Sequence, residues 1–537
     1  MRIAICQVNP TIADLAGNVA LCLEAARKAA NLAADLIVFP EMVIPGYPPR
    51  DLLYDDDFVA ATLAASADFA ARCEGLPPVL FGSIATKDEG QRTKDEKRRT
   101  NRLLPRLLNV AYLAQYGKMT IAAEKRLLPV YDVFYEPRWF VPGAFRPPLE
   151  IGGQKVGILI CEDLWDDDYD IHPAAELKAA GAEVLVCLSA SPYRQGILEK
   201  RIAQAERAAV SINSTTGSTS ASNIQIVFVN LLGANDELIF DGRSFVLDGD
   251  GLRTCKAFEQ DVAAFDVGDW KLVSGNSEHQ SPITIPQLPI PEELACALTL
   301  GIRDFARKNG LKRAFLGVSG GIDSALALVL AVKALGAENV TGVAIPSRFS
   351  DPRSAESARE LCQTLGCGFT EIPLEPLHTA AEALLVELSN PVTLQPSNLQ
   401  PSTFENVQAR LRMLILMSYV NAFGGFLINT SNKTELALGY STLYGDMAGA
   451  LCPLADLTKP QVYALAGFVG RDTISSYIFE RPPSAELKPD QIDPFDYDKI
   501  SPEIEAVVQA DDAHPALKRS EHKRWQFGIV QIGRAHV

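Results

Sequence analysis

Short apolar runs alternate along the chain with segments in which apolar residues recur every three or four positions. The runs have the length of buried strands, and the longer segments have the period of amphipathic helices. In the first half we predict a helix over Asn18–Leu32. The runs that predict strands are Arg2–Val8, Asp35–Phe39, Val79–Gly82, Leu108–Ala114, Lys155–Ile160, Glu183–Leu188 and Gln225–Leu231. This alternation indicates an α/β layered architecture.

A second series of strands and helices follows in the other half of the chain. Its elements are a helix from about Pro291, strand Arg313–Val318, helix Asp323–Leu335, strand Val340–Ile345 and helix Arg353–Leu365. Between the two series, the segment 271–290 is rich in Ser and Pro and has no apolar period, as expected of a linker. A chain of 537 residues is also too long for one compact core. We therefore predict two domains, over 1–270 and 291–531.

Two further segments interrupt the pattern. Lys87–Arg102 carries dense mixed charge and lacks apolar residues, which is typical of a solvated surface loop. The near-identical pentads LQPSN and LQPST occupy Leu394–Thr403. Because they are short, polar and Pro-containing, we expect them to form a flexible loop rather than a structural repeat.

The composition narrows the possible classes of protein. Apolar residues make up 47% of the chain, charged residues make up 22%, and the net charge is −16. This acidic balance argues against a large surface that binds nucleic-acid phosphates, although it permits a local basic pocket for a nucleotide. No apolar run has the length that crosses a bilayer, and MRIAICQVNP lacks the charged head and apolar stretch of a signal peptide. We expect neither a nucleic-acid partner nor a membrane.

The ten cysteines are scattered and never take the CxxC spacing. This pattern disfavours both a zinc site and a disulfide framework. We therefore expect a cytoplasmic protein with free thiols.

A first group of reactive residues lies in the first half. Glu41 follows the predicted strand DLIVFP, Cys161 follows KVGILI, and Lys125 lies between them in EKRLLPVYDVF. Strand ends are where α/β sheets place ligand sites. A thiol becomes nucleophilic when a base takes its proton, and a cation can stabilise the oxyanion that follows. These residues suit amide hydrolysis. Taken singly, each is more often a buried cysteine or a surface charge, and spacing alone does not show that they meet.

The segments around these residues resemble the nitrilase, or carbon–nitrogen hydrolase, superfamily. The similarity covers Met1 to about Trp270 and includes VFPEMVIPGY, KRLLPVYDVFYEPRWF, GILICEDLW and LSASPYRQG. It implies an α-β-β-α sandwich in which Glu41 is the general base, Lys125 the catalytic lysine and Cys161 the nucleophile. It also implies that Glu136 supports the site.

Within that superfamily, the glutamine-hydrolysing branch uses positions that match Tyr131 and Ser191 to hold the substrate. That branch has the pattern SPxxxGK, whereas Gly196 of this chain is followed by Ile197. Lys200 and Arg201 lie close by in the sequence, and whether either replaces the missing ammonium stays open.

A second group of residues surrounds the segment FLGVSGGIDSALALVL. A strand, an SGG turn and a helix from Asp323 would direct backbone N–H groups and the helix dipole at one anion. The segment lacks the GK[ST] of a Walker A loop. An isolated SGG would more often be a turn in which glycines permit close packing.

The longer motif SGGIDSA resembles the pyrophosphate-binding loop of the N-type ATP pyrophosphatases. Within that group, ENVQAR and NKTELALGYSTLYGD in Glu405–Ala466 resemble the NAD synthetases, which implies a doubly wound parallel sheet. The residues implied for ATP and pyrophosphate are Gly317, Val318, Ser319, Gly320, Gly321, Ile322, Asp323, Ser324, Thr430, Lys459 and Ser484. Those implied for deamido-NAD⁺ are Asn406, Glu435 and Lys523, with Asp446 in the same site. Asp323 and Glu435 are implied to hold Mg²⁺, a hard cation that prefers oxygen ligands.

Arg410 and Arg412 lie two residues apart in a predicted helix, so they cannot share one face. We expect one of them to serve a nucleotide phosphate and the other to form a structural ion pair.

Together the two halves resemble the glutamine-dependent NAD⁺ synthetase family over nearly the whole chain. The resemblance implies that glutamine hydrolysis supplies ammonia, and that ATP activates deamido-NAD⁺ as an adenylate, giving NAD⁺, AMP and pyrophosphate. It implies passage of ammonia through the protein and a homo-oligomer built on a synthetase-domain dimer.

At the C-terminus, IGRAHV matches one reading frame of a sequencing adapter, so we expect residues 532–537 to be a non-native tail.

Other interpretations stay open. Ile197 permits an ammonia-dependent synthetase whose amidase half does not bind glutamine. A non-catalytic nucleotide-binding or scaffold protein would have no need for Glu41, Lys125, Cys161 and Asp323 together. A role in tRNA modification is disfavoured by the acidic charge and the absence of a basic tract.

Overall fold

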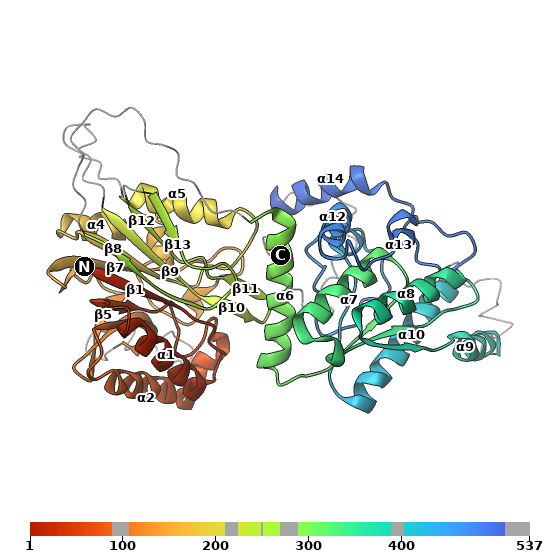
Figure 1. Cartoon of the computed structure of the whole chain (residues 1–537), viewed down its shortest axis with the longest axis horizontal. Helices are drawn as coiled ribbons and strands as arrows, with labels where there is room; N and C mark the ends of the chain where they lie inside the picture. Colours follow the sequence, from red (N-terminus) through yellow and green to blue (C-terminus); the bar gives the residue numbers. More distant parts are fainter. Residues whose placement is uncertain (88–106, 210–223, 249–250, 269–287, 388–401, 511–537) are drawn as a thin grey trace, which may run out of the picture. The chain divides into compact units, whose positions relative to one another are not determined.

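The computed structural model describes residues 1–87, 107–209, 224–248, 251–268, 288–387 and 402–510 (Figure 1). These residues divide into two compact units: one comprises the described residues up to 268 except Asp236–Leu238, and the other comprises those from 288 on together with Asp236–Leu238. Several predicted features lie outside the described residues: the charged loop from residue 88, most of the pentad repeat and of the linker, Lys523 and the tail 532–537.

The first unit contains two six-stranded sheets. The first has the order β14-β1-β2-β3-β4-β5, with β1 Arg2–Gln7, β2 Leu36–Val38, β3 Val79–Thr86, β4 Leu107–Gln115, β5 Lys118–Glu124 and β14 Asp261–Asp266. The second has the order β13-β12-β9-β8-β7-β6, with β6 Leu149–Ile151, β7 Gln154–Ile160, β8 Val184–Ser189, β9 Gln225–Asn230, β12 Phe245–Asp248 and β13 Gly251–Thr254. In both sheets, parallel pairs occupy the middle and antiparallel pairs the edges.

Side-chain alternation along the strands explains why the two sheets stack. Ile3 and Ile5 of β1 contribute to a core with residues of the second sheet, whereas Ala4 and Cys6 contribute to a core with the helices on the other face. The helices are α1 (Leu15–Ala30) and α2 (Asp56–Arg72) on the first sheet, and α4 (Pro173–Ala179) and α5 (Ile197–Ala209) on the second (Figure 1). The predicted α-β-β-α sandwich is confirmed.

Among the differences from the sequence-based prediction, two concern the ends of elements in the first unit. Helix α1 begins at Leu15 rather than Asn18, because the Asp14 side chain accepts a hydrogen bond from the Gly17 N–H and caps the helix. Strand β5, which was not predicted, ends at Glu124, so that Lys125 directly follows a strand. Glu41 and Cys161 likewise follow the ends of β2 and β7 closely.

The second unit is built on a parallel sheet with the order β17-β16-β15-β18. Its strands are β15 Ala314–Gly317, β16 Val340–Ala344, β17 Gly368–Glu371 and β18 Phe426–Leu427. Helices α6 (Ile290–Lys308), α7 (Ile322–Leu335) and α12 (Lys459–Val469) contact one another, α8 (Pro352–Leu365) contacts β16 and β17, and α10 (Thr403–Phe423) contacts β15 and β18. The predicted doubly wound sheet is confirmed. Its order reverses at β15, where such folds bind ligands.

The remaining strands and α-helices of the described ranges are β10 (Leu232–Asn235), β11 (Leu238–Asp241), α9 (Glu375–Glu387), α11 (Lys433–Leu438), α13 (Ser476–Glu480) and α14 (Tyr497–Ala510). Of all the helices in the described ranges, none combines the length and the apolar character that crossing a membrane requires.

Candidate functional site

Three charged side chains are buried together in the first unit. Glu41, Lys125 and Glu136 are respectively 0%, 1% and 3% exposed. The Lys125 ammonium donates to Glu41 Oε1 at 2.8 Å and to Glu136 Oε1 at 2.8 Å. The structure therefore brings together three of the four residues predicted for amide hydrolysis.

Further polar groups hold these carboxylates in place. Asn109 Nδ2 on β4 donates to Glu41 Oε1 at 2.7 Å, and the backbone N–H of Ala190 donates to Glu41 Oε2 at 3.0 Å. The Tyr47 hydroxyl donates to Glu136 Oε1 at 3.1 Å. Asn109 and Tyr47 were not predicted. The signal for Asn109 was a single amide within the otherwise apolar run LLNVAYLA, because buried polar groups must be hydrogen-bonded.

Cys161 lies at the turn after β7, with a φ of 45° and 6% exposure. The Ser189 hydroxyl lies 3.4 Å from its Sγ. Burial raises the pKa of the Cys161 thiol, the charge of Glu41 raises it further, and Lys125 acts in the opposite direction. The thiol is therefore protonated at neutral pH, and attack on a carbonyl requires a base that removes its proton.

Burial also affects the pKa values of Lys125 and Glu136. Desolvation lowers the pKa of Lys125, but the charges of Glu136 and Glu41 outweigh that effect and raise it well above its ordinary value. Lys125 is thus an ammonium at neutral pH. Burial raises the pKa of Glu136. The charge of Lys125 lowers that pKa, and the charge of Glu41 raises it. Such a buried cation can stabilise an oxyanion more strongly than it could in water.

Asp163 ties the lysine segment to the cysteine turn. Its Oδ1 accepts from the backbone N–H groups of Arg126 and Leu127, each at 2.9 Å, and its Oδ2 accepts from that of Ile160 at 3.1 Å. Burial raises the pKa of Asp163 to about 6, against the lowering effect of these hydrogen bonds. Asp163 therefore fixes the separation between Lys125 and the nucleophile.

The predicted glutamine-binding residue Tyr131 contacts a carboxylate that was not predicted. Its hydroxyl donates to Glu162 Oε2 at 2.8 Å, and the Tyr169 hydroxyl donates to Glu162 Oε1 at 3.0 Å. Glu162 is 3% exposed, and burial raises its pKa. Because Glu162 immediately follows Cys161 in the chain, this hydrogen-bonded carboxylate lies next to the predicted nucleophile.

Ser191 has a different environment. Its Oγ accepts from Arg201 Nε at 3.0 Å, and Arg201 also bridges to Asp241 at 2.9 and 3.1 Å. Both Arg201 and Asp241 are fully buried. The charge of Arg201 is therefore balanced by that of Asp241. Ile197 itself is 5% exposed at the start of α5.

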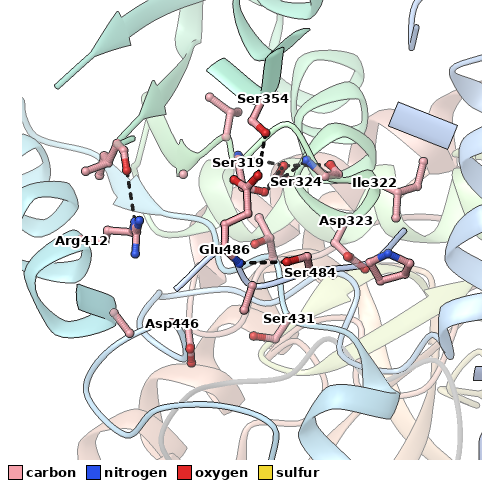
Figure 2. Close-up of a pocket in the computed structure, with 18 of the residues that line it drawn as sticks. Ser319, Ile322, Asp323, Ser324, Ser354, Arg412, Ser431, Asp446, Ser484 and Glu486 are labelled. Carbon is pink, nitrogen blue, oxygen red and sulfur yellow. Dashed lines mark hydrogen bonds between the residues drawn. The ribbon is translucent and has the colours of Figure 1, made fainter. Parts of the chain in front are cut away.

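The second unit contains a pocket of about 310 Å³ at the end of β15 (Figure 2). The glycine-rich turn between β15 and α7 forms part of its wall, and Ser319 and Ser324 lie with their hydroxyl oxygens 3.2 Å apart. Gly320 has a φ of +71°, and a Cβ there would lie 2.4 Å from the Ser354 carbonyl oxygen, so only glycine fits. The predicted residues that line the pocket are Gly317, Val318, Ser319, Gly321, Ile322, Asp323, Ser324, Thr430, Glu435, Asp446, Lys459 and Ser484.

Two carboxylates converge on one ammonium in this pocket. Lys459 Nζ lies 2.5 Å from Asp323 Oδ2 and 3.3 Å from Glu435 Oε1. The Asn432 amide, which was not predicted, donates to Asp323 Oδ1 at 2.9 Å. Burial lowers the pKa of Lys459, but Asp323 and Glu435 raise it above its ordinary value. Burial is the main cause, and the charge of Asp323 the second cause, of a rise in the pKa of Glu435 to about 7.

Convergent carboxylate oxygens suit a hard divalent cation. Within the described ranges, no group of three or more His, Cys, Asp or Glu side chains has a metal-binding arrangement. Asp323 and Glu435 are the pair of pocket carboxylates predicted to hold such a cation.

The remaining predicted residues are placed at different depths. Arg412 lines the pocket and donates to the Ile345 carbonyl at 3.2 Å, and burial lowers its pKa to about 10. Arg410 is exposed and donates to the Leu443 carbonyl at 3.2 Å, so the two arginines do occupy different faces of α10. Asn406 does not line the pocket, and its Oδ1 accepts from Thr442 Oγ1 at 2.8 Å.

Comparison with known proteins assigns each unit to a family. The carbon–nitrogen hydrolase model matches residues 2–267, and the NAD synthase model matches residues 294–523. The chain is 37% identical to a glutamine-dependent NAD(+) synthetase of Synechocystis, covering 91% of this chain and 85% of that relative. It is 34% identical to the protein of the same name from Thermotoga maritima, covering 92% and 85%.

Solved structures give the same result. A glutamine-dependent NAD⁺ synthetase from Acinetobacter baumannii, determined with ADP, has a TM-score of 0.76 and 28% identity over 97% of this chain and 92% of its own. A glutamine-dependent NAD(+) synthetase from Cytophaga hutchinsonii shares the fold, with a TM-score of 0.74 and 20% identity over 100% and 96%. With a hydrolase-type site and a nucleotide-type pocket on one chain, this protein belongs to the family of glutamine-dependent NAD⁺ synthetases.

Proposed function

We propose that this chain hydrolyses glutamine to glutamate and ammonia, and uses ATP and that ammonia to convert deamido-NAD⁺ into NAD⁺, AMP and pyrophosphate. It is thus a carbon–nitrogen ligase with glutamine as the amide donor. The observation that supports the proposal is the presence of two groups of predicted reactive residues on one chain, the buried residues Glu41, Lys125 and Cys161 and the pocket beside the SGGIDS loop.

In the first unit, Glu41 takes the proton of Cys161 as sulfur attacks the carboxamide carbon of glutamine. Lys125 stabilises the oxyanion of the tetrahedral intermediate. Collapse of that intermediate expels ammonia, which receives its proton from Glu41, and a water molecule deprotonated by Glu41 then hydrolyses the thioester. Tyr131 and Ser191 are proposed to position the substrate, and Glu136 to fix the Lys125 ammonium.

In the second unit, the SGGIDS loop binds the phosphates that become pyrophosphate. The nicotinate carboxylate of deamido-NAD⁺ attacks the α-phosphorus of ATP, and ammonia then displaces AMP from the adenylate. Lys459 supplies positive charge to the phosphates, while Asp323 and Glu435 are proposed to hold Mg²⁺. That ion would neutralise phosphate charge as the leaving group departs. Asn406 and Lys523 are proposed to contact deamido-NAD⁺.

A single assay tests this proposal. NAD⁺ formation is measured with glutamine or with ammonium chloride, for the natural chain and for Cys161→Ala. We expect the variant to lose synthesis from glutamine while it keeps synthesis from ammonium. Failure of the natural chain to release pyrophosphate with ATP, deamido-NAD⁺ and ammonium would overturn the proposal.

A second candidate is an ammonia-dependent synthetase, which the environment of Ile197 favours. An apolar residue lies there, and the neighbouring Arg201 is neutralised by Asp241. Ile197→Lys separates the two candidates. If glutamine is the natural donor, the natural chain already hydrolyses it and the substitution only lowers the KM. If it is not, hydrolysis is absent until the lysine is introduced.

We further propose a cytoplasmic location, since all ten cysteines are free thiols, as expected in a reducing compartment. We also propose a homo-oligomer, which light scattering on the purified chain would test.

A further inference from the structure

The segment that follows α13 places both members of an ion pair in the wall of the nucleotide pocket. Arg481 and Glu486 line this pocket, with side-chain exposures of 13% and 15%. The Arg481 Nη2 lies 2.5 Å from Glu486 Oε1. Neither residue was singled out in the sequence, and neither has a role in the reaction described above.

One oxygen of Glu486 accepts from three donors. Besides Arg481, the Ser354 hydroxyl donates to Glu486 Oε1 at 3.1 Å, and the backbone N–H of Asp351 donates to it at 3.1 Å. Arg481 Nη1 also donates to Ser354 Oγ at 2.6 Å. The donors belong to two separate segments, the start of α8 and the residue after α13. Charge-assisted bonds of this kind are those that proteins use for carboxylates and phosphates alike.

This carboxylate lies next to the glycine-rich loop. The backbone of Gly320 abuts Ser354 so closely that a Cβ would lie 2.4 Å from the Ser354 carbonyl oxygen. Figure 2 shows the Glu486 side chain pointing to Ser354. An anion of the protein therefore sits at the edge of the surface that is proposed to receive the phosphates of ATP.

The position of Glu486 matters for phosphate binding because the cations that line the pocket are already engaged by protein groups. Lys459 is shared between two carboxylates, and Arg412 is held by a backbone carbonyl. The Glu486 charge also acts on Arg412, where it opposes the lowering of the pKa by burial. Glu486 thus acts on both guanidinium groups that line the pocket. A polyphosphate that entered beside Glu486 would meet like charge at short range, which is unfavourable.

We propose that Arg481 is a pyrophosphate-binding residue of this pocket, and that Glu486 is an internal anion which holds it until the phosphates of ATP displace the carboxylate. The inference rests on the proposed function, since it requires that pyrophosphate leave through this pocket. When ATP enters, Arg481 and Ser354 release the Glu486 carboxylate and donate to phosphate oxygens instead. Both kinds of oxygen are anionic hydrogen-bond acceptors. When pyrophosphate leaves, Glu486 returns to the vacated donors, which favours product release.

The test measures binding of inorganic pyrophosphate with Mg²⁺ to the full chain by titration calorimetry. Glu486→Gln removes the competing charge and keeps the size of the side chain, so we expect pyrophosphate to bind roughly fivefold or more tightly. Arg481→Met removes the donor, so we expect about a tenfold or greater loss of affinity. In steady-state assays, Arg481→Met should raise the KM for ATP and leave the KM for deamido-NAD⁺ unchanged.

The chain offers a matched control. Arg359 and Glu371 form an exposed ion pair of the same length, 2.5 Å, in the same unit and away from the pocket. Glu371→Gln and Arg359→Met should leave pyrophosphate affinity unchanged, and thermal melting verifies that all four variants are folded. Unchanged or weaker pyrophosphate binding by Glu486→Gln would overturn the inference. The proposed function would still be supported in that case if the natural chain makes NAD⁺ from ammonium. If the natural chain neither makes NAD⁺ nor binds pyrophosphate, both fail.

Discussion

At the scale of single residues, the first site is a small set of buried charges that depend on one another. Lys125 carries one positive charge between two carboxylates, Glu41 and Glu136, and all three are withdrawn from water. An unpaired buried charge costs several kcal/mol, on the order of 3–5 when its partner is removed. Catalysis and stability are therefore coupled here, and substitutions must keep the size and hydrogen bonds of the side chains they replace.

Glu41→Gln is the most direct test of the general base. The amide oxygen can still accept from Asn109 and Lys125, although the Ala190 N–H loses its acceptor, and the side chain can no longer take a proton from Cys161. We expect glutaminase activity to fall about 10²–10⁴-fold, the usual contribution of a general base. Ammonium-driven NAD⁺ synthesis should be unaffected. The exposed Glu24→Gln is the control, and equal loss of both activities would point to unfolding instead.

The reactivity of Cys161 should depend on pH in a particular way. Because burial and Glu41 raise the pKa of the thiol, the free enzyme holds little thiolate at neutral pH. Inactivation of the glutaminase by iodoacetamide should therefore keep accelerating as the pH rises past about 8.5, the ordinary value for a thiol. The measured quantity is the rate of activity loss between pH 6 and 9.5. A plateau near neutrality would mean that a stable thiolate already exists.

Sequence motifs were sufficient to name Glu41, Lys125, Cys161 and Asp323, because each lies in a distinctive run of residues. Glu162, Asn432 and Glu486 were missed for a physical reason. Whether a polar side chain points into a site depends on the strand or helix it packs against, and a lone acid or amide in a loop carries no such information.

At the scale of elements, most parallel strands were predictable because they are buried on both faces and form continuous apolar runs. The short parallel strands β17 and β18 were not predicted, and the residues of β17 are half-buried or exposed. The edge strands β5, β13 and β14 were not predicted. Their residues are largely half-buried or exposed and their apolar runs are short (VAAF in β14), so pairing with a neighbouring strand is what defines them. Lys125 follows one of these edge strands, and its approach to Glu41 therefore could not be derived from periodicity alone.

The turn between β15 and α7 provides a test at this scale. Gly320→Ala would place a methyl group 2.4 Å from the Ser354 carbonyl oxygen, so the turn must shift. We expect ATP affinity to fall by at least about tenfold, since the N–H groups of this turn are proposed to face the phosphates. Glutaminase activity should be retained. Calorimetric titration with ATP measures the effect.

Gly310→Ala is the matched control for that substitution. Gly310 has nearly the same φ, +67°, but nothing lies within 4 Å of an added Cβ. It should therefore show only the backbone cost, about 1–2 kcal/mol of stability, with normal ATP binding. Equal effects of the two substitutions on ATP affinity would mean that close packing against Ser354 has no part in binding.

At the scale of the whole molecule, each unit has its own sheets and cores, and the two families match separate stretches of the chain. In the sequence, a Ser/Pro-rich segment between two apolar series predicts a division of this kind. Each half-reaction should accordingly survive loss of the other. Why they share a chain is a chemical question, because ammonia released into neutral water becomes ammonium, which is not a nucleophile.

Mixing two single-site variants tests whether ammonia stays with the protein. Cys161→Ala keeps the synthetase site, and Asp323→Asn keeps the glutaminase site while it loses a carboxylate proposed to hold Mg²⁺. If ammonia passes within one chain, an equimolar mixture supplied with glutamine should make NAD⁺ at only a small fraction of the natural rate, because ammonia must cross bulk water. Excess ammonium should restore synthesis by Cys161→Ala and so show that its site is intact. A mixture that matches the natural chain at limiting protein concentration would show instead that the two sites communicate through solvent.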